Sequence, residues 1–432
     1  MNSVFNDEPS KIVVTCPPGV AHVLSRELSE LGFRPGASLG SSVETEGTLA
    51  DCVALNLRLR TAHRVLYALD VFRARNGEDV YDELVALPWE RYLDPDGYVS
   101  VDRAVDNPTI RDSRYAALKV KDAIADRMRN ACGRRPDSGS DRTDACVFLH
   151  WVGDRASVYL DTTGVSLSFR GYRAVSSEAP LRETLAAALV LGSGWNRRDP
   201  FLNPMCGGAT IAIEALWAAQ NRAPALLRDN FAFMHLSCFD PSVLTRERAS
   251  ALRDWEEGKK NAPVVVASDV DSGAVEAARA NVEAAGAAGA VQIECCDVVA
   301  SPVPPVREGG RGMAILNPPY GGRIGDPVRL RDTYEDLGAF LAVAAEAGYG
   351  SVVITGNPEL AEGAGLSARR VRTVHSGGIE CALLFDASLS QAARRRFRRR
   401  NPGIRIPDAE ESLPRGQDAE TMNPPQRTAS PS

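Results

Sequence analysis

The sequence predicts an α/β protein with a doubly wound, mostly parallel sheet in its C-terminal part and an α+β region before it. From about residue 180 onwards, short apolar runs alternate with helical patterns, which is typical of parallel strands linked by helices. The first 165 residues lack this alternation and contain small strand and helix units instead. The change of pattern predicts separate N-terminal and C-terminal domains.

The N-terminal region is predicted to begin with a strand at 11–15, where the β-branched run "KIVVT" leads into Pro-Pro-Gly. A helix follows, because apolar residues recur at helical spacing until Gly32, which is a plausible stop. The other expected elements are a strand–helix–strand unit at 41–74, a helix at 114–130 and a hairpin that turns at Gly153 and Asp154.

Apolar runs mark the strands of the predicted parallel sheet. They are found in "DPFLN", "VVVASD", "VQIECCD", "GMAILN" and "GSVVITGN", and "IECALLFDA" at 379–387 is expected to add another strand. Beyond about residue 391 the composition shifts to Arg, Pro, Ser, Glu and Gln, which predicts a disordered tail.

The composition is that of an ordinary globular protein, with 44% hydrophobic and 25% charged residues in a chain of 432. No apolar run has the length of a membrane span, and the N-terminus lacks the order of a signal peptide, so we expect a cytoplasmic protein with no membrane partner. The nine cysteines include no CxxC pair and the five histidines form no HExxH, which argues against a bound metal.

Basic character is local in this chain, whose net charge is −6. The tail "ARRRFRRRN" holds six arginines between Arg394 and Arg400. These could bind RNA phosphates by counterion release, with Phe397 available for stacking. The alternative is a solvated tail without a function.

A glycine turn, "NPMCGGAT" at 203–210, stands between a predicted strand and a predicted helix. In an open parallel sheet, ligands bind at the carboxyl ends of the strands, and Gly207 and Gly208 would let the backbone pass close to a ligand. The alternative is a simple connecting turn.

Acidic residues end the next two predicted strands. Asp269 is placed to accept hydrogen bonds from ribose hydroxyls, whereas Asp271 fits the N-cap of the following helix. Asp297 is the equivalent residue of the third strand, where it would contact an adenine amino group or cap a loop. The absence of GxGxxG favours a nucleoside cofactor without a pyrophosphate.

The segment "NPPY", Asn317 to Tyr320, ends another apolar strand. The Asn317 side-chain oxygen and the Pro318 carbonyl can accept hydrogen bonds from a nucleobase amine and direct its lone pair outward. Consecutive prolines fix the loop, and Tyr320 can stack on a base removed from its helix. The alternative is a proline-rich turn with Tyr320 packed beneath it. The first interpretation predicts a loop that presents an exocyclic amine to an electrophile.

These motifs resemble those of class I S-adenosylmethionine-dependent methyltransferases: "NPPY" is similar to motif IV, and "NPMCGGAT" to the "DPMCGSGT" form of motif I. The segments "KIVVTCPPGV", "LNLRLRTAHRVL", "ALKVKDAIADRM", "LDTTGVSLSFRGYR" and "APLRETLAAALVL" resemble the THUMP-containing RNA guanine-N2 methyltransferases. The resemblance covers roughly residues 10–387. It implies a Rossmann-like methyltransferase sheet, parallel with one antiparallel edge-side strand, behind a ferredoxin-like and THUMP region that binds RNA.

The resemblance also implies domain limits, which are a ferredoxin-like segment at 1–55, a THUMP domain at 56–168, the methyltransferase domain at 175–390 and the tail at 391–432. Its implied catalytic residues, which would hold the target base, are Asn317, Pro318, Pro319 and Tyr320. Its implied S-adenosylmethionine-binding residues are Asn203, Met205, Cys206, Gly207, Gly208, Asp269, Asp297 and Glu183.

Two positions depart from the family pattern. Asn203 replaces an acidic residue and removes a charge that would face the methionine ammonium. Ala209 replaces a glycine and adds a Cβ, which is tolerable if φ is negative.

The leading hypothesis is methylation of the guanine N2 amine in rRNA or tRNA, with RNA as the partner of the THUMP region. The alternatives are N6-adenine methylation, since the NPPY loop suits either amine, and a non-catalytic RNA-binding or ribosome-assembly factor.

Overall fold

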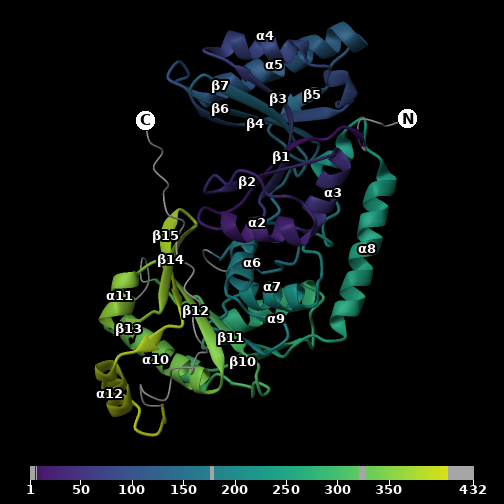
Figure 1. Cartoon of the computed structure of the whole chain (residues 1–432). Helices are drawn as coiled ribbons and strands as arrows, with labels where there is room; N and C mark the ends of the chain where they lie inside the picture. Colours follow the sequence, from purple (N-terminus) through teal and green to yellow (C-terminus); the bar gives the residue numbers. More distant parts are fainter. Residues whose placement is uncertain (1–4, 6, 176–179, 321–326, 407–432) are drawn as a thin grey trace, which may run out of the picture.

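The computed structural model describes residues 5, 7–175, 180–320 and 327–406. Two seven-stranded sheets dominate it, one in the N-terminal region and one in the C-terminal region (Figure 1). This arrangement confirms the predicted α/β fold class. In the described part of the chain, no helix combines the length and the apolar character that crossing a membrane requires.

The N-terminal sheet has the strand order β2-β1-β3-β7-β6-β4-β5. The strands are β1 (Ser10–Thr15), β2 (Ser42–Gly47), β3 (Arg64–Arg73), β4 (Tyr98–Asp106), β5 (Asp137–Gly139), β6 (Ala145–Val152) and β7 (Arg155–Asp161). Strand β3 pairs with β1 on one side and with β7 on the other. The ferredoxin-like and THUMP segments therefore share one continuous sheet, and β6 and β7 form the predicted hairpin.

Helices cover this sheet. They are α2 (Ala21–Glu30), α3 (Leu49–Arg58), α4 (Gly77–Ala86) and α5 (Ser113–Cys132), with the short 3₁₀ helix η1 (Trp89–Arg91). Of these, α3, α4 and α5 begin at side-chain caps. Thr48 and Asp51 form a capping box at the start of α3, and Gly133 ends α5 with φ of 76°. The predicted limit between residues 55 and 56 falls inside α3.

The C-terminal sheet has the strand order β10-β9-β8-β11-β12-β15-β14. Its strands are β8 (Phe201–Pro204), β9 (Val265–Asp269), β10 (Val291–Cys295), β11 (Gly312–Leu316), β12 (Tyr349–Thr355), β14 (Arg370–Ser376) and β15 (Ile379–Phe385). All neighbours are parallel except that β15 runs antiparallel to both β12 and β14. The predicted parallel sheet with one antiparallel edge-side strand is confirmed.

Helices pack on both faces of this sheet. One face is covered by α6 (Glu183–Gly192), α7 (Thr210–Ala219) and α9 (Ser272–Ala284). The other is covered by α10 (Pro327–Glu346), α11 (Pro358–Gly363) and α12 (Gln391–Arg400). The smaller elements are the 3₁₀ helices η2 (Ala232–His235) and η3 (Val298–Ala300) and the paired strands β13 (Leu366–Ser367) and β16 (Ser388–Leu389).

The connection after α7 returns to the N-terminal region before the long helix α8 (Pro241–Lys259) begins. Phe231 and Phe233 are buried in the N-terminal core, and the Phe233 N–H donates to the Thr162 carbonyl at 3.0 Å. On α3, Arg58 contacts Asp254 of α8 at 2.8 Å. The two regions are therefore interlocked along the chain rather than joined by a single linker.

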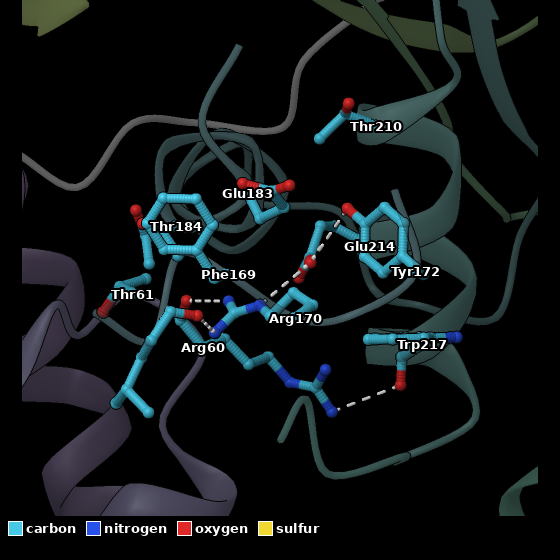
Figure 2. A network of polar contacts seen from close by, with 12 residues as sticks. Arg60, Thr61, Phe169, Arg170, Tyr172, Glu183, Thr184, Thr210, Glu214 and Trp217 are labelled. Atoms are coloured by element: carbon cyan, nitrogen blue, oxygen red, sulfur yellow. Dashed lines mark hydrogen bonds and ion pairs between the residues drawn. The ribbon is translucent and has the colours of Figure 1, made fainter. Parts of the chain in front are cut away.

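A buried polar network adds to this interlocking (Figure 2). The Arg170 guanidinium, 1% exposed, donates to Glu214 at 3.2 Å and to the Leu167 carbonyl at 2.7 Å. Arg60, which follows α3, donates to the Trp217 carbonyl at 3.2 Å. Glu214 and Trp217 both lie on α7, so the N-terminal region contacts the helix that follows the glycine turn.

The prediction that disorder begins at residue 391 is wrong for α12. Phe397 is fully buried there, and Arg396 pairs with Glu335 of α10 at 2.7 Å. Arg400 contacts Asp332 and Asp336 of the same helix. The composition suggested a solvated tail, but Phe397 packs against α10, whose carboxylates neutralise part of the positive charge. Phe397 is therefore not available for stacking, and residues 407–432 lie outside the described part.

Candidate functional site

The carboxyl ends of four adjacent strands carry the residues that the sequence singled out. Along the sheet edge, β10 leads to Asp297, β9 ends at Asp269, β8 leads into the glycine turn, and β11 leads to Asn317. The pairing of these strands is parallel, so all four ends lie at the same edge. The structure thus brings segments far apart in the sequence into one row.

The glycine turn is conformationally unusual. Met205, Gly207 and Ala209 have positive φ values of 55°, 51° and 60°. Ala209 thus does not meet the condition of a negative φ under which its Cβ would be tolerated, and an alanine in this region carries a strain of about 1–2 kcal/mol. Burial raises the pKa of the Cys206 thiol to about 12, so this cysteine is neutral and not a nucleophile. The turn therefore acts through its backbone.

Asp269 stabilises that backbone. Its Oδ2 accepts a hydrogen bond from the Gly207 N–H at 2.9 Å, and its Oδ1 accepts one from the Asp271 N–H at 3.1 Å. Asp271 caps α9 through the Gly273 N–H, as predicted. Asp297 caps η3 and is exposed, in agreement with the capping alternative.

Asn203 connects the glycine turn to the strand before Asn317. Its Nδ2 donates to the Ile315 carbonyl at 2.9 Å, a bond that a carboxylate at this position would not make. Its Oδ1 is buried and has no hydrogen-bond partner in the described structure. Buried acceptors are normally paired, so this oxygen is suited to a hydrogen-bond donor from a ligand.

Glu183 also lies beside the glycine turn (Figure 2). It is the first residue of α6, and Arg173 donates to its Oε1 at 2.7 Å. The same guanidinium contacts the hydroxyl of Thr210, the first residue of α7, at 3.3 Å. This arrangement places Glu183 next to the start of α7.

The NPPY loop is held by two tyrosines. The Tyr320 hydroxyl donates to the Asn317 Oδ1 at 2.5 Å, and burial raises the pKa of Tyr320 well above its usual value. The fully buried Tyr334 on α10 bonds the Thr355 hydroxyl at 2.7 Å and the Pro319 carbonyl at 3.4 Å. Because a carbonyl oxygen has two lone pairs, Asn317 can accept a second hydrogen bond from a ligand.

Three residues near the site were not found from the sequence. They are Arg173, Tyr334 and Asn281, whose Nδ2 donates to the Gly208 carbonyl at 3.1 Å. None of them belongs to a recognisable motif, because each acts through a contact that depends on the packing of a helix or linker. No cluster of His, Cys, Asp or Glu that could hold a metal ion occurs in the ranges that the structure describes.

Three family models match the chain in order. These are the RlmL ferredoxin-like domain over residues 11–66, the THUMP domain over residues 74–161 and the RMKL-like methyltransferase domain over residues 170–384. Their order agrees with the two sheets and with the position of the strand-end residues.

Curated relatives include the Ribosomal RNA large subunit methyltransferases K/L of Syntrophotalea carbinolica and Methylococcus capsulatus. Each is 36% identical, over 88% and 86% of this chain, respectively. The matches cover 54% and 50% of those proteins, so the chain spans about half the length of the curated relatives it matches.

Solved structures show the same fold. SMU.472 complexed with SAH has a TM-score of 0.75 and 27% identity, with 89% of this chain and 99% of that chain covered. A predicted N6-adenine-specific DNA methylase from Listeria monocytogenes has a TM-score of 0.77 and 28% identity, with coverage of 88% and 96%. The chain therefore belongs to the S-adenosylmethionine-dependent methyltransferases in which an RlmL ferredoxin-like domain and a THUMP domain precede an RMKL-like methyltransferase domain.

Proposed function

We propose that this protein methylates the exocyclic N2 amine of a guanine in large-subunit rRNA, with S-adenosylmethionine as the donor. The order of the strand ends supports this proposal. Asp297, Asp269 and the glycine turn would follow the adenine, ribose and methionine parts of the donor, and Asn317 stands at the next strand end. The methyl group would then face the amine held by the NPPY loop.

Each side of the proposed site has residues suited to its ligand. Asp269 would accept hydrogen bonds from the ribose hydroxyls of the donor. The Asn203 Oδ1, which has no partner in the described structure, would accept a hydrogen bond from the methionine ammonium. The Asn317 side-chain oxygen and the Pro318 carbonyl would accept hydrogen bonds from the two hydrogens of the amine. The nitrogen lone pair would then point outward, towards the methyl group of the donor. The donor supplies an electrophilic methyl group: a nitrogen–carbon bond forms, the sulfur–carbon bond breaks, and the amine releases a proton to solvent.

The choice of RNA is supported by the THUMP domain and by the relatives' names, which refer to rRNA of the large subunit. The NPPY loop alone suits an adenine N6 amine equally well, and the Listeria structure is described as a predicted adenine-specific DNA methylase. N6-adenine methylation is therefore the second candidate.

The product of the reaction distinguishes these candidates. Unmodified 23S rRNA transcribed in vitro is incubated with the protein and methyl-labelled S-adenosylmethionine, then digested to nucleosides and analysed by mass spectrometry. We expect label in N2-methylguanosine. Label in N6-methyladenosine would establish the second candidate, and label only with tRNA as acceptor would change the substrate class.

A non-catalytic RNA-binding factor would give no labelled product with either RNA. Calorimetric titration with S-adenosylmethionine tests that case separately. We expect saturable binding, because the buried Asn203 oxygen and the backbone turn are both suited to the donor. A lack of binding at millimolar donor would contradict the proposed enzyme.

A further inference from the structure

Four basic side chains from two distant parts of the sequence meet on one surface. His22 and Arg26 lie one turn apart on α2, and Arg370 and Arg372 lie on the edge strand β14. Arg372 contacts the His22 ring directly, and Arg370 lies 4.1 Å from the centre of the Phe385 ring. Figure 1 shows α2 next to this part of the second sheet. We call these four residues the α2–β14 patch.

The three arginines carry the positive charge of the α2–β14 patch, because burial and the neighbouring Arg372 lower the pKa of His22. This charge is not neutralised locally. All four residues are exposed, and none of them makes an ion pair with a carboxylate within the described ranges of the chain. Burial, and then the charges of Arg370 and Arg26, lower the pKa of Arg372. In a chain of net charge −6, where many arginines are paired, such a cluster is suited to an anionic partner.

The patch is held in place by the packing of α2 on β14. Gly19, which precedes α2, has φ of 88°, and a Cβ there would lie 2.5 Å from the Thr373 carbonyl oxygen. Only a glycine allows this close approach of the two backbones. The basic residues of the two domains are therefore brought together by a rigid contact and not by flexible side chains alone.

The strand register places the patch near the NPPY loop. Leu316 of β11 pairs with Val353, and Ile354 pairs with Leu383, which in turn pairs with Arg372. Arg372 is thus level with Asn317, three strand spacings away, or about 14 Å. Alternation along β14 puts Arg370 and Arg372 on the same face as the buried Val374, and Tyr320 packs against that same core.

We propose that the α2–β14 patch binds the phosphate backbone of the substrate RNA beside the nucleotide that enters the NPPY loop. This inference rests on the proposed RNA substrate and assigns a part of its path. A polyanion with a base at Tyr320 would need to span about 14 Å, or three strand spacings, to reach Arg372. The N-terminal domain contributes to this contact through α2, in addition to any role of the THUMP domain.

Binding of unmodified 23S rRNA transcript, measured over a range of salt concentrations, tests the proposal. In the Arg26→Ala/Arg372→Ala variant, we expect affinity to fall by about tenfold or more at low salt. The logarithmic salt dependence should become shallower by about 1.4, since two single-strand phosphate contacts are lost. The Arg26→Lys/Arg372→Lys variant should keep most of the affinity because it keeps both charges.

The matched control is Arg246→Ala/Arg253→Ala, which removes two exposed arginines from α8, on the far side of the molecule in Figure 1. It should leave affinity and salt dependence unchanged, and all variants should keep the S-adenosylmethionine affinity of the parent. If the parent methylates RNA while Arg26→Ala/Arg372→Ala binds it normally, or if the control loses as much affinity, the patch proposal is wrong and the proposed function stands. A parent that neither binds nor methylates RNA would overturn both.

Discussion

The glycine turn after β8 and the NPPY loop after β11 lie at neighbouring strand ends but are built in opposite ways. The glycine turn bends through positive φ values at Met205, Gly207 and Ala209. Within this turn, the Gly207 N–H donates a hydrogen bond to Asp269. The NPPY loop has two prolines and is held from within by the Tyr320 hydroxyl and from outside by the Tyr334 hydroxyl of α10.

This difference corresponds to what each loop would bind. A turn that bends sharply at glycines can approach a bound methyl donor closely. Pro318 and Pro319 have no N–H group and so contribute only carbonyl acceptors, which suits the hydrogens of an amine. Asn203 joins the two, since it lies in β8 just before the glycine turn and donates to the Ile315 carbonyl of β11. Three substitutions test this comparison, in order of expected effect.

The largest effect is expected from Asn317→Ala on the target side. Loss of one preorganised hydrogen-bonding group in an active site lowers the rate by about 10²–10³-fold. We expect methyl transfer to 23S rRNA to fall by this amount while RNA and S-adenosylmethionine affinities stay within a few-fold. The matched control is Asn357→Ala, which removes the cap of α11 after the neighbouring strand β12. Equal rates for Asn317→Ala and the parent would contradict the role of the NPPY loop.

An intermediate effect is expected from Asn203→Asp at the link between the loops. A carboxylate at this position is buried and faces the Ile315 carbonyl. In the absence of S-adenosylmethionine, we therefore expect the unfolding free energy of the variant to be lower than that of the parent by about 2–3 kcal/mol at pH 7.5. Burial raises the pKa of a carboxyl in the folded state, so the loss should shrink as pH falls towards about 4, where the unfolded carboxyl is also protonated.

Urea denaturation at pH 4.5 and 7.5 measures this difference. The Asn203→Ala variant removes the side-chain N–H that bonds the Ile315 carbonyl without adding a charge. Its loss of unfolding free energy should therefore not depend on pH. If Asn203→Asp matches the parent at pH 7.5, the Asn203 amide is not needed to connect β8 with β11.

The smallest effect is expected from Ala209→Gly on the donor side. Glycine relieves about 1–2 kcal/mol of strain at φ of 60°, but it removes a buried methyl group worth about 0.8 kcal/mol and adds chain entropy to the unfolded state. We expect the unfolding free energy to change by less than about 1 kcal/mol. Gly208→Ala is the useful contrast, because its Cβ would lie 3.0 Å from Asn281 Nδ2. A loss above about 2 kcal/mol for Ala209→Gly would contradict this balance.

Local patterns in the sequence were enough to predict most elements of both sheets and the strand-end position of the candidate residues. Apolar runs identified the strands, and Asp271 was predicted as a cap because it directly precedes a helical pattern. The same local reasoning failed for α12, where composition suggested disorder. The packing of Phe397 and the carboxylates of α10, more than 50 residues earlier in the chain, stabilise that helix instead.

The fold class and the motifs at the ends of β8 and β11 could be predicted from the sequence, because strand periodicity and the chemistry of Gly, Pro and Asn act over a few residues. The order of the domains followed from the family resemblance. The φ of Ala209, the partner of Asn203, the support from Tyr334 and the meeting of α2 with β14 became visible in the three-dimensional structure alone. Each of these depends on which strands become neighbours and how helices pack on them. Contacts between residues so far apart along the chain leave no local pattern from which they could be predicted.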